Sequence, residues 1–355
     1  MVDNLLLPAA PMLHPPSPGG LSSDDFKTDQ EARWCPGCGD YAILAAVQGL
    51  LPELGLAREN IVFVSGIGCS SRFPYYLNTY GMHSIHGRAP AIATGLATAR
   101  PDLSVWVVTG DGDALSIGGN HLIHTLRRNV NLKILLFNNR IYGLTKGQYS
   151  PTSEAGKVTK STPGGSVDQP VNPIALALGA EATFVARTVD SDRQHLTAVL
   201  REAARHRGTA LVEILQNCTI FNDGAFSELK DPETRDDATV RLRHGEPVTF
   251  GTKNPKGVRI ASRGGLEIVP LDGASADSLL VHDVHDEDSS IAYMLARLPE
   301  RPGGVVPLGI FRAVDRPAYD DLVNDQLLRA RADDPAPDLS AIVAGGDTWR
   351  VTSRD

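Results

Sequence analysis

The sequence predicts an α/β fold built on a doubly wound parallel sheet with a C-terminal extension. Short apolar runs alternate with helical patterns, and each run leads into a turn that carries Gly, Asn or Cys. Continuous apolar strands separated by amphipathic helices are typical of a parallel sheet covered on both faces. We expect strands at 61–66, 104–110, 132–137, 182–188 and 209–215, and helices at 40–53, 87–99, 115–129, 172–179 and 191–206.

Three segments follow from the composition along the chain. Residues 1–29 are rich in Pro, Ser, Gly and Asp without apolar periodicity, so we expect a mobile N-terminal arm. Residues 30–222 carry the strand and helix patterns and should form the sheet domain. Residues 223–355 contain charged stretches, candidate hairpins and a few helices without a chemical motif, which indicates a subunit-contact extension.

Charge and hydropathy exclude two classes of partner. The net charge of -8 disfavours nucleic acid, because it would repel the phosphate backbone. No stretch approaches the roughly 20 apolar residues of a membrane span. The apolar LLLPAAPML near the start is broken by Pro8 and Pro11 and lacks the basic flank of an export signal. We therefore expect a cytoplasmic protein.

The most specific motif is Gly110-Asp111-Gly112, followed after 25 residues (113–137) by Asn138-Asn139. A right-handed βαβ unit would bring Asp111 and Asn139 to the same edge of the sheet, where ligands bind in folds of this class. Carboxylate and amide oxygens suit magnesium, and glycines allow a close approach to phosphate. Without the spacing, a tight Asp-Gly turn and an Asn-rich loop would be ordinary features.

This pattern resembles the thiamine-diphosphate signature, and the resemblance implies that the doubly wound sheet is of the thiamine-diphosphate-binding type. By that resemblance, magnesium would be coordinated by Asp111, the side chain of Asn139 and the carbonyl oxygen of Ile141. The diphosphate would be lined by Gly112, Asp113, Gly143 and Leu144.

Four cysteines, Cys35, Cys38, Cys69 and Cys218, follow strand ends or precede a helix near the same edge. Disulfides are rare in cytosolic proteins, so a metal site is the better interpretation. Four thiolates suit tetrahedral zinc or a 4Fe-4S cluster, and a redox pair is a further alternative. A neighbouring thiamine site favours the cluster, because a cluster accepts single electrons and zinc does not.

Longer matches resemble one family, the 2-oxoacid:ferredoxin oxidoreductase beta subunits, over nearly all of residues 30–230. The 4Fe-4S ligands of that family fall on the four cysteines, and its thiamine-contacting turn falls on Ile67, Gly68, Cys69 and Ser70. The matching stretches are WCPGCGDYAIL (34–44), GIGCSSRFPYY (66–76), HSIHGRAPAIATG (83–95), GDGDALSIGGNH (110–121), NNRIYGLTKGQYSPT (138–152) and NCTIFND (217–223).

Three residues are candidates for substrate binding and catalysis. Arg72 follows Cys69 by three residues, and guanidinium binds a carboxylate bidentately; a surface salt bridge is the alternative. His86 could hydrogen-bond cofactor or substrate, although a histidine at a helix entry often serves as a cap. Lys146 could pair with the distal carboxylate of 2-oxoglutarate, which pyruvate lacks.

The resemblance implies an enzyme subunit that uses 2-oxoglutarate, coenzyme A and oxidised ferredoxin to give succinyl-coenzyme A, carbon dioxide and reduced ferredoxin. A pyruvate, branched-chain or indolepyruvate form is an alternative, as is a non-catalytic zinc scaffold or electron-transfer module. The family has a separate alpha subunit that supplies a glutamate to thiamine and the coenzyme A site. We therefore expect a doubled αβ assembly rather than an independent enzyme.

Overall fold

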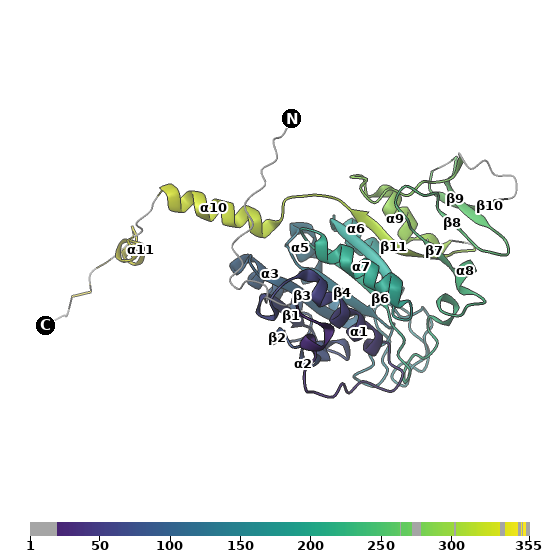
Figure 1. The fold of residues 1–355 in the computed structure, drawn as a ribbon, viewed down its shortest axis with the longest axis horizontal. Coiled ribbons are helices and arrows are strands. Elements are labelled where there is room, and N and C mark those ends of the chain that lie inside the picture. The colour runs from purple at the N-terminus through teal and green to yellow at the C-terminus, as the bar shows by residue number, and fades with distance from the viewer. Residues whose placement is uncertain are drawn as a thin grey trace.

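The computed structural model describes residues 20–262, 264–271, 278–301, 303–333, 338–346, 349 and 351–352. Within these residues the chain forms a mixed, mostly parallel sheet of eight strands in the order β2-β1-β3-β4-β6-β5-β11-β7 (Figure 1). All neighbouring strands run parallel except β11 and β5. The strands are β1 (Ile61–Ser65), β2 (Tyr80–His83), β3 (Ser104–Gly110), β4 (Lys133–Asn138), β5 (Phe184–Val189), β6 (Ala210–Leu215), β7 (Thr239–Arg241) and β11 (Val306–Ala313).

Helices cover both faces of this sheet, because successive apolar side chains of the central strands point to opposite faces and make both faces apolar. In β3, Val105 and Val107 belong to one buried cluster, whereas Trp106 and Val108 belong to another. The first cluster packs against α3 (Ala89–Ala99), α5 (Gly119–Arg128) and α6 (Pro173–Gly179). The second packs against α1 (Asp40–Leu50) and α7 (Arg193–Arg205). The predicted α/β fold is therefore confirmed, as a mixed rather than purely parallel sheet.

The predicted helix over 115–129 is broken into α4 (Asp111–Leu115) and α5. The break occurs at Ser116–Gly118, where a Cβ on Gly118 would lie 2.5 Å from the carbonyl oxygen of Asp113. A further strand, β2, was not predicted. Its four residues are all exposed at the sheet edge, so it lacks the apolar run that identified the other strands.

The expected start of the folded domain at residue 30 is too late. Phe26, in a short 3-10 helix (Ser23–Phe26), is fully buried in the core beside α1. Its carbonyl oxygen accepts a hydrogen bond from the backbone of Asn78, and residue 27 bridges to Leu77. Residues 20–29 are thus part of the packed domain, and the remainder of the expected arm, residues 1–19, lies outside the described residues.

The expected boundary at residue 222 is also not a structural division, because β7 and β11 both join the main sheet. Phe311 on β11 is fully buried in the core shared with α3 and α6. The predicted hairpin is present as β9 (Lys256–Ile260) and β10 (Leu266–Pro270), which with β8 (Thr249–Phe250) form a separate antiparallel sheet. The other elements are α2 (Phe73–Tyr76), α8 (Arg235–Ala238), α9 (Ser290–Ala296), α10 (Tyr319–Asp333) and α11 (Leu339–Ala344).

Figure 1 shows α10 and then α11 leading away from the sheet toward the C-terminus. Both helices leave apolar side chains exposed, among them Leu328 and Ile342. Among the described helices, none combines the length and the apolar character that crossing a membrane requires.

Candidate active site

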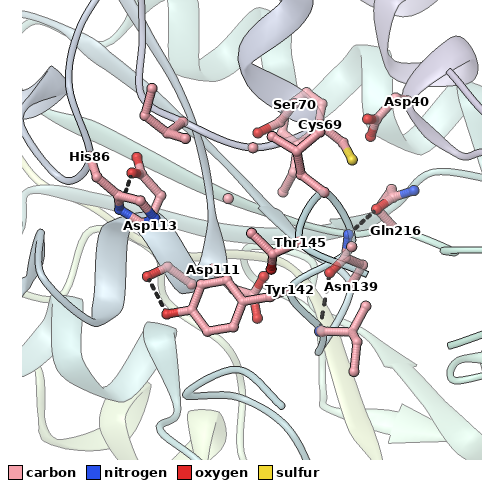
Figure 2. Close-up of a pocket in the computed structure, with 18 residues that line it drawn as sticks. Asp40, Cys69, Ser70, His86, Asp111, Asp113, Asn139, Tyr142, Thr145 and Gln216 are labelled. Carbon is pink, nitrogen blue, oxygen red and sulfur yellow. Dashed lines mark hydrogen bonds and ion pairs between the residues drawn. The ribbon is translucent and has the colours of Figure 1, made fainter. Parts of the chain in front are cut away.

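Loops at the carboxyl ends of β1, β3, β4 and β6 surround a cavity (Figure 2). The parallel strands bring these loops to one edge of the sheet, as the βαβ argument predicted. His86 and Asp113 lie on one wall, and Asn139 and Gln216 lie on the other. The lining residues are Asp40, Ile67, Gly68, Cys69, Ser70, His86, Gly110, Asp111, Gly112, Asp113, Phe137, Asn139, Ile141, Tyr142, Gly143, Leu144, Thr145 and Gln216.

Asp111 is the acidic group expected to hold magnesium, and it is almost fully buried at the start of α4. Two hydroxyls hold its carboxylate: Ser150 Oγ and Thr152 Oγ1 donate to Oδ2 over 2.5 and 2.6 Å. Burial raises the pKa of Asp111 to about 6, against the lowering effect of these hydroxyls. Sequence reasoning missed both hydroxyl residues, which lie in a loop without periodicity.

Asp113 orients the loop that carries His86. Its Oδ1 accepts from the backbone N–H of Gly87 and lies 2.8 Å from His86 Nδ1, and its Oδ2 accepts from Thr109 Oγ1 over 2.7 Å. A Cβ on Gly66 would lie 1.8 Å from the same carboxylate, so only glycine fits there. Asp113 lines the cavity, and its carboxylate anchors His86 through Nδ1, which leaves Nε2 for other partners.

Gly112 is needed for a reason that the sequence did not indicate. A Cβ at this position would lie 2.1 Å from Cε1 of Tyr142, whose hydroxyl donates to the Gly112 carbonyl over 3.0 Å. The glycine therefore allows the ring of Tyr142 to pack over the backbone. Burial raises the pKa of the Tyr142 hydroxyl, which keeps it in the donating, protonated form.

The two asparagines after β4 have different roles. Asn139 faces the cavity, where its Nδ2 donates to Gln216 Oε1 over 2.9 Å and its Oδ1 accepts from the Ile141 N–H over 3.2 Å. Asn138 turns into the protein interior and donates to Glu213, which also pairs with buried Arg187 over 2.6 Å. Only Asn139 is placed to reach a ligand in this cavity.

All four cysteines line a second cavity beside the first. Cys35 is exposed, and the other three are partly exposed. The two cavities share five wall residues: Cys69, Asn139, Gly143, Leu144 and Gln216. The expected juxtaposition of the cysteines with the GDG and NN motifs is therefore present.

The thiols lie close enough to affect one another electrostatically. Burial, and next the carboxylate of Asp40, raise the pKa of Cys69 to about 11, and the same two causes raise the pKa of Cys38. A Cβ on Gly143 would lie 3.5 Å from Cys218 Sγ and 3.7 Å from Cys69 Sγ. Among the described residues, no group of three or more His, Cys, Asp or Glu side chains has the arrangement of a preformed metal-ion site.

The expected substrate cations are also found at the second cavity. Arg72 and Lys146 both line it, and Arg72 Nη1 donates to the carbonyl oxygen of Arg33 over 2.6 Å. Lys146 has a φ of 76°, held by a tight turn in which its N–H donates to the Gly143 carbonyl. His86 lines the first cavity instead, so the three proposed catalytic residues are divided between the two sides of the shared wall.

Several wall residues were not identified from the sequence. Trp34 donates from Nε1 to the Cys69 carbonyl over 2.7 Å and so ties the first cysteine motif to the second. Buried Asp40 begins α1 between the cavities, and burial raises its pKa to about 7. Trp34 and Asp40 lie within the matched stretch 34–44. Their position next to Cys35 and Cys38 in the sequence was the only feature that could have identified them as wall residues.

Comparisons with known proteins agree with this geometry. Residues 66–214 match the family model of the thiamine pyrophosphate enzyme C-terminal TPP binding domain. The chain is 63% identical to the 2-oxoglutarate oxidoreductase subunit KorB of Mycobacterium tuberculosis, over 92% of this chain and 88% of that one. It is 48% identical to subunit beta of 2-oxoacid:ferredoxin oxidoreductase 1 of Aeropyrum pernix, over 56% of this chain and 62% of that one.

A solved structure of a similar protein has the same fold. The 2-oxoglutarate:ferredoxin oxidoreductase from Magnetococcus marinus, with 2-oxoglutarate, coenzyme A and succinyl-CoA bound, superposes with a TM-score of 0.72 at 35% identity. The match covers 92% of this chain and 97% of that chain.

The sheet, the cavity at its carboxyl edge and the family match define a thiamine-diphosphate-binding domain of an oxidoreductase. The similarity extends over nearly the whole chain, well beyond that domain. The chain belongs to the beta subunits of the 2-oxoglutarate:ferredoxin oxidoreductases.

Proposed function

We propose that this chain is the beta subunit of a cytoplasmic enzyme that converts 2-oxoglutarate, coenzyme A and oxidised ferredoxin into succinyl-coenzyme A, carbon dioxide and reduced ferredoxin. In this proposal the first cavity holds thiamine diphosphate with magnesium, and the second holds a 4Fe-4S cluster. One observation carries the proposal: the cavity of the GDG motif and the cavity of the four cysteines share a wall. An electron released in one cavity would need to cross only that wall.

The first cavity has the donors that a magnesium diphosphate requires. Asp111 offers a carboxylate fixed by two hydroxyls. Asn139 offers a side-chain amide oxygen, and Ile141 offers a backbone carbonyl oxygen. Magnesium prefers oxygen ligands and is commonly held by a few protein oxygens together with phosphate oxygens. Ser70 Oγ is buried in the wall and has no hydrogen-bond partner among the described residues. A buried hydroxyl of this kind is normally satisfied, and a bound diphosphate would supply the acceptor.

The second cavity suits a cluster better than a single zinc ion. Its four thiols line one cavity together with two cations, and among the described residues they do not converge on one point as ligands of a single ion would. Gly143 leaves room between Cys69 and Cys218, where a side chain would contact both sulfurs. Bound iron would also offset the unfavourable burial of the thiolates, because metal coordination deprotonates a thiol.

In this proposal different side chains bind different parts of the substrate and the cofactor. When bound, thiamine diphosphate supplies the carbon nucleophile and the electron sink for decarboxylation. Arg72 and Lys146 line the cysteine cavity, on the other side of the shared wall from the thiamine site. In this proposal they bind the two carboxylates of 2-oxoglutarate from that side, Lys146 taking the distal carboxylate that pyruvate lacks. His86, held at Nδ1 by Asp113, presents Nε2 for a hydrogen bond to cofactor or substrate.

A partner chain is part of the proposal. Activation of thiamine requires a carboxylate against its aminopyrimidine ring, and the described residues that line the first cavity include no glutamate. An alpha subunit would supply that glutamate and the coenzyme A site, with ferredoxin as the electron acceptor. The beta-subunit names of the relatives imply such a partner for those proteins.

Turnover with a panel of oxoacids tests this function. The chain is loaded anaerobically with iron, sulfide and thiamine diphosphate, and ferredoxin reduction is followed with the chain alone and with its alpha partner. We expect activity only with the partner, with kcat/KM highest for 2-oxoglutarate. Turnover by the chain alone would contradict the subunit assignment, and a preference for pyruvate would contradict the substrate.

A further inference from the structure

Gln216 is the only glutamine that lines both cavities within the described part of the chain. It follows β6 directly, and its side chain is 1% exposed. Its backbone N–H donates to the Asn138 carbonyl over 2.9 Å, which extends the pairing of β6 with β4 by one residue. The sheet itself therefore fixes where this side chain begins.

The side-chain amide bridges the two proposed cofactor sites. Its Oε1 accepts from Asn139 Nδ2 over 2.9 Å (Figure 2). Its Nε2 donates to Cys38 Sγ over 3.2 Å. Nε2 also donates to the carbonyl oxygen of Asn217. One amide thus contacts a proposed magnesium ligand with its oxygen and a proposed cluster ligand with its nitrogen.

The orientation of this amide is fixed by its neighbours. Asn139 Oδ1 accepts from the Ile141 N–H, so Nδ2 is the atom that faces Gln216, and it needs an acceptor. The Gln216 nitrogen must then face Cys38. A Cβ on Gly39 would lie 1.9 Å from Asp190 Oδ2 and 2.9 Å from Gln216 Cγ, so the glycine between Cys38 and Asp40 leaves space for both side chains.

We infer that Gln216 is a positioning residue that serves both cofactors, an inference that rests on the proposed function. Its N–H donor to Cys38 would stabilise the more negative, reduced state of the cluster, because hydrogen bonds to the sulfurs set the potential of such clusters. Its oxygen holds Asn139 in the rotamer that presents Oδ1 to the metal, as outer-shell partners of metal ligands do. The two contacts make separate predictions.

Two substitutions separate these contacts. Gln216→Glu keeps an acceptor for Asn139 and loses the donor to Cys38, whereas Gln216→Met has a similar length and loses both. Gln48→Met is the matched control, because Gln48 is a buried glutamine on α1 that donates to the Tyr76 carbonyl and lines neither cavity. Each variant is purified anaerobically as the complex with its partner chain.

Cluster potential is measured by a redox titration followed by electron paramagnetic resonance, and magnesium affinity by titration at saturating thiamine diphosphate. In both Gln216 variants we expect the ratio of reduced to oxidised cluster at a fixed potential to fall roughly tenfold, which is about 59 mV for one electron. Magnesium affinity should fall about 10- to 100-fold in Gln216→Met and stay near wild type in Gln216→Glu. Gln48→Met should change neither quantity.

Other outcomes overturn the inference. An unchanged potential in Gln216→Met, which adds no charge, would remove the donor role, and equal magnesium affinity in all variants would remove the role at Asn139. Loss of iron from both Gln216 variants would show a merely structural residue. A wild-type complex without cluster or thiamine would instead contradict the proposed function, and this inference would fall with it.

Discussion

Replacing Thr152 with valine removes one hydroxyl from the carboxylate of Asp111 while keeping the branched shape of the side chain. Thr152 is buried, and its Oγ1 lies 2.6 Å from Asp111 Oδ2 and 2.9 Å from Asn138 Oδ1. Ser150 would remain as the other hydroxyl donor to Asp111. The substitution therefore loosens the proposed metal ligand without removing it.

Two independent magnitudes agree on the expected effect. A hydrogen bond to a charged group contributes about 1.5–3 kcal/mol, and about 1.4 kcal/mol corresponds to a tenfold change in an equilibrium constant. Loss of an outer-shell partner typically lowers metal affinity about 10- to 100-fold. We therefore expect Thr152→Val to weaken magnesium-dependent binding of thiamine diphosphate about 10- to 100-fold.

The assay is a magnesium titration at saturating thiamine diphosphate, followed by calorimetry or by quenching of protein fluorescence. Thr125→Val is the matched control, because Thr125 is also buried and hydrogen-bonded, to Thr94 on α3, and it lines neither cavity. The control should bind magnesium like wild type. Wild-type magnesium affinity in Thr152→Val would refute the assignment of Asp111 as a metal ligand held by these hydroxyls.

Three further predictions concern the cluster, the substrate and acid stability. Cys218→Ser should lose most of the cluster iron while keeping thiamine binding; full iron content would show that the fourth ligand is misassigned. Arg72→Ala should raise KM for the oxoacid more than KM for coenzyme A, and equal increases would indicate a structural role. Burial lowers the pKa of His195 to about 4 from 6.5, so its contribution to stability is complete above pH 6.5 and is lost as the pH falls toward 4. Between pH 7.5 and 5 the free energy of unfolding should drop by about 2 kcal/mol from this residue, and urea unfolding of His195→Gln should show a correspondingly smaller drop.

The fold was predictable where strands are continuous and apolar. β1, β3, β4, β5 and β6 all lie within about two residues of their expected bounds, because their buried runs are unlike any other part of the chain. β11 could not be placed, since its pairing with β5 joins residues more than a hundred positions apart. Nothing local in 306–313 specifies that partner.

The candidate site was likewise predictable only in part. Asp111 and Asn139 could be brought together from topology alone, because parallel strands end at one edge. Ser150, Thr152 and Gln216 could not, since each is a single polar residue in a loop and is identified only by what it contacts. Gly112 lines the cavity, and its role toward phosphate stays a prediction; the packing of the Tyr142 ring against it could not be foreseen from the sequence.

The central claim, that thiamine diphosphate and a 4Fe-4S cluster occupy adjoining cavities of this chain, is tested most directly by composition. The complex is purified anaerobically from its native cell, and iron, zinc, acid-labile sulfide, magnesium and thiamine are measured per chain. We expect about four irons and four sulfides, together with one magnesium and one thiamine diphosphate. Stoichiometric zinc without iron, or a complex free of thiamine, would contradict the account.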